Sequence, residues 1–281
     1  MISCTIQKAS RIGRLLFGFS VLAAIASTIN VSATVRYVDL NSTSPAPPYT
    51  NWTSAATNIQ GAVDAADAGD EIVVTNGVYQ TGGRLVYGLM NNRVAVTKPV
   101  TVRSVNGPVV TVIQGYQVTG TTNGDGAIRC VYLTNGAALV GFTLRSGGTR
   151  ISGAGDLERS GGGVLCESSS AMVSNCVLTG NSADTFGAGA CYGTLNNCTL
   201  TSNSGSFQGG GAFSGTLNNC AITGNSAVIG GGAYESTLNN CTLVGNTASS
   251  SQGGTHGGTV KNCIVYYNSH FGDNLRKIFR R

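Results

Sequence analysis

The sequence predicts an all-β fold, a right-handed parallel β-helix (a β-solenoid) of about 22 residues per coil with a short N-terminal capping helix. Three observations lead to this fold class: a repeat with that period, strand-like strings punctuated by Asn and Gly, and an unusual composition. Of 281 residues, 41 are glycine and only 10% are charged, while 41% are hydrophobic. Charge-driven disorder is therefore excluded, and enough apolar residues remain for a packed core.

The repeat is anchored by five cysteines that stand 22, 22, 21 and 22 residues apart. A polar residue, asparagine in every case, precedes each cysteine, and an aliphatic residue follows two positions after it. Chance does not produce this register, so we take these positions as structural columns of stacked coils. The predicted structural ladder comprises Asn175, Asn197, Asn219, Asn240 and Asn262 together with Cys176, Cys198, Cys220, Cys241 and Cys263.

Two further columns share this register. A second asparagine stands five residues after each cysteine, and a glycine stands nine residues before each of the last four. Period-two alternation directs Cys220 and Ile222 inward and Ala221 and Thr223 outward. Both asparagine columns are expected where the chain turns, because asparagine tolerates the left-handed conformation and stacked amides can hydrogen-bond along a column.

The predicted elements begin with a signal peptide at residues 1–33. Lys8, Arg11 and Arg14 form a basic segment without acids, and the apolar stretch 15–29 follows before small residues at the cleavage site. The expected localisation is therefore secreted or cell surface, with membrane contact only through this peptide. Cleavage at an earlier small-residue site and retention as an uncleaved anchor are the alternatives.

Residues 34–270 are predicted to form the β-helix domain. Apolar residues at helical spacing predict a capping helix at 57–66, and a glycine stop and a strand follow it. Phe142 stands where the later repeats have cysteine, so the degenerate upstream part is expected to share the coil architecture. Further strands are expected at 94–104, 109–113, 128–133 and 138–144, and regular coils at 160–268.

The chain is expected to end in a basic tail or C-terminal cap at residues 271–281. The repeat stops there, and Leu275, Ile278 and Phe279 follow at helical spacing among four basic residues. A fragment of a longer protein is the alternative. Without residues 1–33 the formal net charge falls from +5 to +2, and the tail carries +3 of it, which leaves −1 for the body. We therefore expect no nucleic-acid partner.

These motifs resemble a known family. The helix followed by Ala-Gly-Asp-Glu-Ile-x-Val-x-x-Gly-Val-Tyr, and the later Asn-Cys-x-Leu-Thr-x-Asn-Ser-Ala coils, are similar to secreted bacterial right-handed parallel β-helix proteins of the pectin-lyase-like superfamily. The Gly-Gly-Ala and Asn-Ser-Ala repeats also resemble those of chlamydial polymorphic outer-membrane proteins, although those usually have Phe where this chain has Leu or Ile. The resemblance spans about residues 35–270 and implies the fold more than a function, since the superfamily includes lyases, hydrolases and adhesins.

Eight cysteines follow the signal peptide, enough for four disulfides in a secreted chain. In the repeat, however, equivalent Cβ atoms are separated by a strand spacing of about 4.8 Å, more than the separation of about 3.8 Å that a disulfide needs. Buried free thiols are therefore the preferred interpretation of the column. Cys130, Cys166 and Cys191 lie outside it, and a Cys166–Cys191 bridge is the alternative for two of them. The spacings do not suit a zinc site, and no metal site is expected.

Catalytic candidates lie in and beside one insertion in an otherwise uncharged repeat. The family resemblance implies two kinds of catalytic site. The lyases of the family use a cluster of acidic residues that binds calcium, together with an Arg or Lys base, and its hydrolases use several aspartates on one sheet. The repeated coils here carry almost no acids, whereas the insertion 149–159 concentrates charge. The alternative is a solvated loop with surface ion pairs. The candidates are Arg145, Arg150, Asp156, Glu158 and Arg159.

A second candidate site is an aromatic column. Alignment on the Gly-Gly-Gly-Ala string puts Cys191 and three aromatic residues at equivalent outward positions of consecutive coils. Ring faces spaced by one coil would suit stacking against a sugar or a partner chain. Packing under a neighbouring loop, or an inward orientation, is the alternative. The candidate ligand-binding residues are Phe213, Tyr234, Glu235 and His256.

Regular coils without a catalytic cluster favour a secreted or cell-surface scaffold, non-catalytic, that serves adhesion or glycan binding. The expected partner is an extracellular polysaccharide or a surface protein, and a monomer without a cofactor is expected. The alternative is a polysaccharide lyase or glycoside hydrolase acting on an acidic polysaccharide through the insertion, for which the resemblance would imply Ca²⁺ in a lyase.

Overall fold

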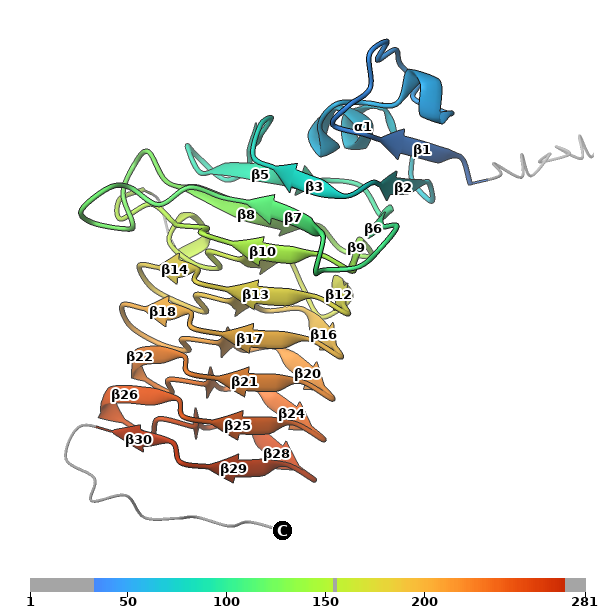
Figure 1. Ribbon diagram of the computed structural model, residues 1–281. Helices are drawn as coiled ribbons and strands as arrows, with labels where there is room; N and C mark the ends of the chain where they lie inside the picture. Colours follow the sequence, from blue (N-terminus) through green and yellow to red (C-terminus); the bar gives the residue numbers. More distant parts are fainter. Residues whose placement is uncertain (1–32, 154–155, 271–281) are drawn as a thin grey trace, which may run out of the picture. The chain divides into compact units, whose positions relative to one another are not determined.

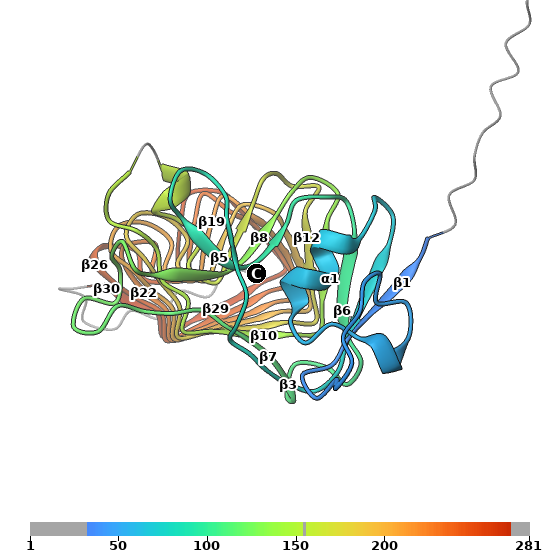
Figure 2. The same ribbon diagram turned by 90° about the horizontal axis from the view of Figure 1, so that it is seen from above.

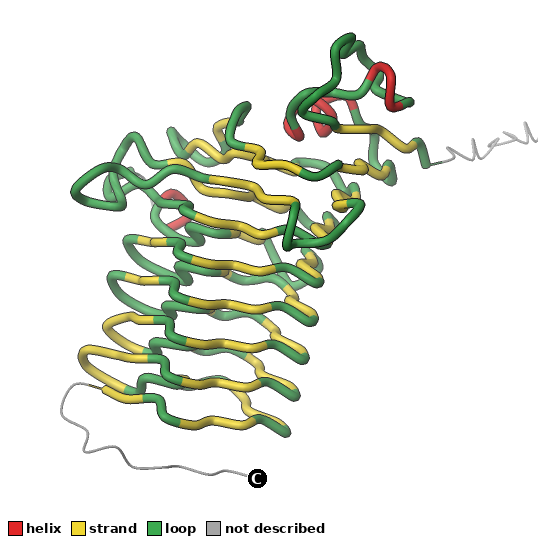
Figure 3. Tube along the Cα trace, in the orientation of Figure 1, coloured by secondary structure: helices red, strands yellow, loops and turns green. Residues whose placement is uncertain are grey.

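The computed structural model describes residues 33–153 and 156–270, and these form a parallel β-helix of stacked coils (Figure 1). This confirms the predicted fold class. Successive coils place their strands in sheets that run along the stack, as Figure 3 shows, with loops at the corners. Apart from the antiparallel β4–β5 pair, the pairings between named strands are parallel within the described residues. The predicted signal peptide apart from Ala33, and the predicted tail, lie outside this description.

Three long sheets build the wall of the β-helix, and each takes one strand from nearly every coil. The first contains, in spatial order, β1 (Val35–Val38), β2 (Glu71–Val74), β6 (Thr101–Ser104), β9 (Ala138–Val140), β12 (Met172–Ser174), β16 (Thr194–Asn196), β20 (Thr216–Asn218), β24 (Thr237–Asn239) and β28 (Thr259–Lys261). The second contains β3 (Gly77–Tyr79), β7 (Thr111–Gln114), β10 (Thr143–Arg145), β13 (Val177–Thr179), β17 (Thr199–Thr201), β21 (Ala221–Thr223), β25 (Thr242–Val244) and β29 (Ile264–Tyr266).

The third sheet carries the candidate aromatic column, and a short fourth sheet forms the corner beside it in the later coils. The third contains β4 (Arg84–Leu85), β5 (Asn91–Val96), β8 (Ile128–Leu133), β11 (Val164–Cys166), β15 (Ala190–Cys191), β19 (Ala212–Phe213), β23 (Ala233–Tyr234) and β27 (Thr255–His256). The fourth contains β14 (Ser182–Ala183), β18 (Ser204–Gly205), β22 (Ser226–Ile229), β26 (Thr247–Ser251) and β30 (Ser269–His270).

The two asparagine columns have different roles. The column that precedes the cysteines makes the turn between the first and second sheets: Asn197 and Asn219 are exposed and have φ of 53° and 55°. Asparagine fits there because it tolerates the left-handed conformation better than most residues. We expected side-chain hydrogen bonds along both columns. The asparagines that precede the cysteines do not form such a ladder, whereas those of the second column do. That second column is Asn181, Asn203, Asn225, Asn246 and Asn268.

The buried ladder satisfies every polar atom of its amides. The Asn225 carboxamide oxygen accepts bonds from the backbone N–H and Nδ2 of Asn203, at 3.0 and 2.9 Å. Its own Nδ2 donates to Leu200 O at 2.9 Å and to Asn246 Oδ1 at 3.0 Å. Asn225 is 0% exposed. An amide can be buried this deeply only because each of its groups has a partner on a neighbouring coil.

The glycine column is a steric consequence of the stacking of the coils. A Cβ at Gly211 would collide with the carbonyl oxygen of Gly232 and lie 3.1 Å from Asn225 Nδ2. The backbone of the next coil therefore leaves no room for a side chain at that position, and the amide ladder packs tightly against it as well.

The cysteine column lies in the core as predicted, and the eight described cysteines are free thiols, including Cys166 and Cys191. Each column thiol donates to backbone carbonyls, as Cys220 does to Asn218 O at 3.3 Å. Phe142 takes the cysteine position in an upstream coil and is fully buried. The interior is thus continuous between degenerate and regular coils.

The N-terminal helix α1 (Ile59–Ala65) covers the first coils and is shorter than the predicted 57–66, because Asn58 is its N-cap and Ala66 its C-cap. Ile59 and Val63 join the core. Gln60 bonds the edge of β5: its Oε1 accepts from Ala95 N at 2.7 Å and its Nε2 donates to Ala95 O at 3.3 Å. Figure 2 views the coils from this end. The helix therefore supplies both apolar cover and hydrogen bonds to the end of the β-helix.

Several predicted strands join two observed ones. The predicted strands 94–104 and 138–144 each turn a corner, the second at Gly141 with φ of 81°. The prediction at 109–113 is shifted to β7, and the strand at 128–133 matches β8. The N-terminal strand β1 and the 3-10 helix η1 (Trp52–Ser54) were not anticipated. In the described ranges, no helix is long and apolar enough to cross a membrane.

We predict that Asn225→Ala destabilises the fold by about 3 kcal/mol, because it strands buried donors of Asn203 and the Leu200 carbonyl. The exposed turn variant Asn219→Gly is the control, with an expected change within about 0.5 kcal/mol. Urea unfolding followed by circular dichroism measures both. Equal midpoints for the two variants would contradict a stabilising role for the ladder.

Candidate functional site

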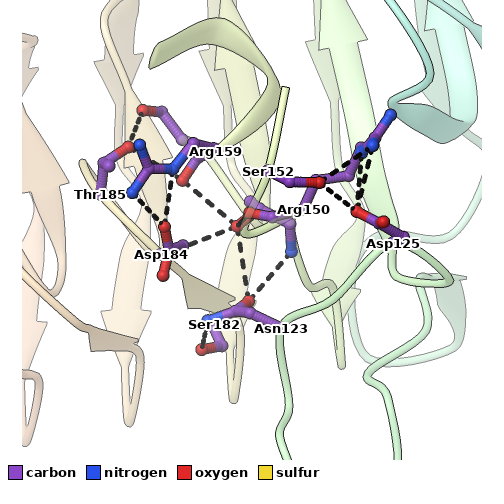
Figure 4. A network of polar contacts seen from close by, with 10 residues as sticks. Asn123, Asp125, Arg150, Ser152, Arg159, Ser182, Asp184 and Thr185 are labelled. Carbon is purple, nitrogen blue, oxygen red and sulfur yellow. Dashed lines mark hydrogen bonds and ion pairs between the residues drawn. The ribbon is translucent and has the colours of Figure 1, made fainter. Parts of the chain in front are cut away.

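The charged insertion between β10 and β11 contains the 3-10 helix η2 (Asp156–Glu158) and folds around a buried ion pair. Arg150 Nη1 lies 3.0 Å from Glu158 Oε2, and these side chains are 8% and 4% exposed. The other edge of the guanidinium donates to Asp125 Oδ1 from Nε and Nη2, at 3.1 and 3.0 Å (Figure 4). Ser152 donates to the same oxygen at 2.7 Å, and this bond, together with those from Arg150, lowers the pKa of Asp125.

The Glu158 carboxylate also fastens the insertion to the loop between β4 and β5. Its Oε2 accepts the backbone N–H of Leu89 at 3.0 Å. A Cβ at Gly88 or Gly153 would collide with the carboxylate, so the backbone closes over it. We expected a solvent-facing candidate here, but Glu158 and Arg150 are buried and engaged with each other.

A second ion pair joins the insertion to the next coil. Arg159 Nε donates to Asp184 Oδ2 at 2.7 Å, and the Arg159 carbonyl accepts the Thr185 N–H and hydroxyl at 2.9 and 3.0 Å. Thr149 bridges the same segments: it donates to Arg159 O at 3.2 Å and accepts from Asp184 N at 2.9 Å. Figure 4 shows this network, in which Asn123 also donates to Ser182. The arrangement connects three successive coils.

The remaining two candidates, Asp156 in the insertion and Arg145 beside it, lie on the surface. Asp156 is exposed at the start of η2, and Arg145 is exposed on β10, where its Nε donates to Gln114 at 3.0 Å. The five candidates therefore do not converge on one solvent-facing point. Arg150 and Glu158 neutralise each other, Arg159 is paired with Asp184, and Asp156 and Arg145 belong to different segments.

The sequence analysis did not identify Arg129, a residue of β8 whose side chain binds backbone carbonyls of the insertion. This side chain is fully buried in β8. Its Nη1 donates to Asn92 Oδ1 at 2.8 Å, and its Nη2 donates to the carbonyls of Leu157 and Ser160 at 2.6 and 2.8 Å. Burial lowers its pKa to about 10, so it stays charged at neutral pH. A charged residue inside the predicted strand 128–133 was the available signal for a buried anchor.

The aromatic column runs down the outer face of the third sheet, in the predicted register. Phe213 pairs with Tyr234 across β19 and β23, and Tyr234 pairs with His256 across β23 and β27. The rings stack on one another: the centroids of Phe213 and Tyr234 are 5.5 Å apart at 2°, and those of Tyr234 and His256 are 5.1 Å apart at 3°. Phe186 extends the stack from a loop, 4.4 Å from Phe213.

This stacking corrects the expected mode of binding. Within the column each ring covers the face of the next, so the rings present edges to solvent rather than the faces we expected a sugar to stack on. Cys191 belongs to the same outward column but is buried under an apolar cover that includes Leu157 and Phe186. The half-exposed part of the column therefore begins at Phe213.

Glu235 is exposed at the turn that follows Tyr234 and has φ of 46°. Its carboxylate lies against Gly257, where a Cβ would collide with it. This places one carboxylate beside the lower end of the column, next to His256 in the following coil. Phe213, Tyr234, His256 and Glu235 thus form one surface, which we call the column face.

Other chemistry is limited in the described residues. Burial raises the pKa of the Cys130 and Cys166 thiols to about 12, which disfavours their nucleophilic thiolate form. No group of three or more His, Cys, Asp or Glu side chains in the described ranges is placed to hold a metal ion.

Comparison with known proteins gives likeness at the level of fold. No family model matches the chain, and no curated protein matches it. A pectin methylesterase in complex with a hexasaccharide is similar with a TM-score of 0.44 and 14% identity, over 80% of this chain and 67% of that one. Pectin methylesterase from carrot gives 0.42 and 15%, over 79% and 64%, and the rice weevil enzyme gives 0.39 and 16%, over 68% and 63%. These values are too low to carry an inference about activity or substrate.

We predict that Arg150→Ala destabilises the protein by about 3 kcal/mol or more, because it leaves Glu158 buried without its counter-ion. The double variant Arg150→Met/Glu158→Met should recover most of that loss, since it removes both charges together. The exposed Arg145→Ala is the control, expected within about 0.5 kcal/mol. Thermal unfolding of the three variants tests this. A fully stable Arg150→Ala protein would show that the pair has no structural role.

Proposed function

We propose that this chain is a secreted or cell-surface β-helix that binds an extended polysaccharide, without turnover, along the column face. The observation that carries the proposal is the in-register, half-exposed row Phe213, Tyr234 and His256 with Glu235 beside it. Exposed patches of this kind mark interaction surfaces when they are contiguous. Here contiguity is supported by direct ring stacking from coil to coil.

The geometry suits a ligand that lies lengthwise on the face. Ring edges and the tyrosine hydroxyl offer apolar contact and hydrogen bonding at once. A carboxylate can accept hydrogen bonds from sugar hydroxyls, which Glu235 would supply at the turn. One ring face is free of a ring partner within the described column, the side of His256 that faces away from Tyr234. A single pyranose ring can stack there while its neighbours run along the edges.

Charge favours a neutral polysaccharide over an acidic one. Glu235 is the charged residue of the column face and is exposed, whereas the buried Arg129 cannot reach a ligand. Like charges at short range oppose an anionic chain. A neutral chain meets no such repulsion.

The catalytic alternative, a lyase or hydrolase acting on an acidic polysaccharide through the insertion, has less support. Its strongest candidates are Arg150 and Glu158. These two side chains are paired with each other, and Glu158 also binds the loop between β4 and β5, so both have structural roles. Secretion through residues 1–33 and a monomeric state belong to the same proposal.

We predict that the full chain binds at least one neutral polysaccharide and that Tyr234→Ala and His256→Ala each weaken binding at least fivefold, because each removes one ring of the row. Trp52→Ala is the matched control, since Trp52 is an exposed aromatic residue outside the column. Affinity electrophoresis on a panel of neutral and acidic polysaccharides measures retention, and circular dichroism verifies the fold.

The same panel separates the alternatives. Unsaturated products or new reducing ends, lost on Arg145→Ala and retained in Tyr234→Ala, would replace the proposal with an enzyme. Absence of retention on every polysaccharide would overturn glycan binding and favour a protein partner. Binding that Trp52→Ala weakens as much as Tyr234→Ala would remove the column face as the site.

A further inference from the structure

The ring row of the column face leaves one requirement of sugar binding unmet. Phe213, Tyr234 and His256 cover one another's faces, so edges meet the solvent along the row. The flat side of a pyranose ring packs best on the flat side of an aromatic ring. Apart from the free side of His256, a surface for several sugars therefore needs further groups beside the row.

A second row of side chains comes from the corner loops that follow the strands of the fourth sheet. Isolated β-bridges align Phe186 with Gln208 and Gln208 with Ile229, and Ile229 pairs with Ser251 across β22 and β26. Backbone bonds hold this register, since Gly187 N donates to Gln208 O at 3.0 Å. All four aligned side chains are partly exposed. We call these four positions the flank row.

The Phe186 ring shows that the flank row adjoins the ring row. Its centroid is 4.4 Å from that of Phe213, and the two planes make an angle of 17°. Phe186 belongs to the coil before that of Phe213. Because the coils repeat in register, Gln208 takes the equivalent position one coil later, on the side of Tyr234. The two rows are therefore adjacent parts of one surface.

Gln208 brings an unused amide to this surface. It is partly exposed, and its side chain makes no hydrogen bond to another residue in the described ranges. The amides of the buried ladder differ, because those of Asn203 and Asn225 are fully bonded between coils. A free carboxamide has both a donor and an acceptor, so it can bond two hydroxyl groups of one sugar.

Phe207, the residue before Gln208, supplies the ring face that the ring row lacks. It is 44% exposed. Its centroid is 6.1 Å from that of Phe186 at an interplanar angle of 39°, and this is its one ring contact among the described residues. An exposed ring with a single tilted neighbour keeps a face open to a ligand.

We propose that Phe207 and Gln208 determine which sugars the column face accepts. The ring of Phe207 stacks on a pyranose, and the amide of Gln208 bonds two of the hydroxyl groups of the chain. This inference rests on the proposed binding of a neutral polysaccharide and names the class more closely, as one whose hydroxyl groups are unsubstituted. An O-methyl group removes the donor that the amide oxygen needs, and so leaves a polar group unpaired in the complex.

Affinity electrophoresis of the full chain in gels that contain glucomannan, galactomannan or xyloglucan tests the two residues. Phe207→Ala should weaken binding at least fivefold, whereas Phe207→Tyr keeps a ring face and should bind like the unmodified chain. Gln208→Met removes the amide at nearly equal length and should weaken binding at least threefold. The control is Gln80→Met, at an exposed glutamine after β3, which should leave binding unchanged.

The hydroxyl groups that Gln208 reads are tested from the ligand side. Partial O-methylation of the bound polysaccharide should weaken binding of the unmodified chain at least threefold and change binding of Gln208→Met much less. This non-additivity is expected only where the amide and the hydroxyl groups are direct partners. An equal loss in both proteins would show that the amide does not contact them.

The remaining outcomes separate this inference from the proposed function. Binding that falls in Tyr234→Ala but is unchanged in Phe207→Ala and Gln208→Met would overturn the inference and leave the column face as the site. Failure of the unmodified chain to bind any of the polysaccharides would overturn the proposed function itself. A lower urea midpoint in Phe207→Ala, with binding that Phe207→Tyr does not restore, would assign Phe207 a structural role and count against the inference.

Discussion

The buried asparagine ladder is the interaction on which the regular part of this β-helix depends. Each amide bonds both neighbouring coils, so a register slip of one residue in any coil would leave four buried groups unpaired. The ladder starts where the upstream coil has Gly147, whose N–H donates to Asn181 Oδ1 at 2.9 Å. It continues to Asn268, which accepts from Asn246 in the last described coil. In-register stacking of every other column, aromatic and thiol alike, follows from this constraint.

Several charged side chains attach the insertion between β10 and β11 to the regular coils. Arg150 and Glu158 lie inside the insertion, Arg159 reaches the next coil, and Arg129 holds the loop from the third sheet beneath it. The insertion contributes Leu157 to the cover over the upper part of the outward column. It thereby determines where the column face begins, so the two candidate sites are parts of one arrangement in which the first limits the extent of the second.

Periodicity predicted the fold and the columns because both are properties of the repeat. The 22-residue register fixes which residues stack, so the positions of Cys220 or Tyr234 follow without knowledge of any contact. It does not fix the rotation of a side chain about its own bonds, which is why the stacked rings were expected to show their faces. Corner positions such as Gly141 were missed because one apolar string continues through the turn. The burial of Arg150 could not be predicted, because a loop rich in charged residues is expected to be solvated unless its partners in other segments are known.

The position of each ring in the column determines what its loss would do to the column face. Tyr234 stacks on Phe213 on one side and on His256 on the other, so its removal would separate the two remaining rings. His256 is the last ring of the described stack, so its removal would shorten the row and leave the contact between Phe213 and Tyr234 in place. A ligand that runs along the row should therefore depend more on Tyr234, whereas a ligand that occupies only the free side of the last ring should depend more on His256.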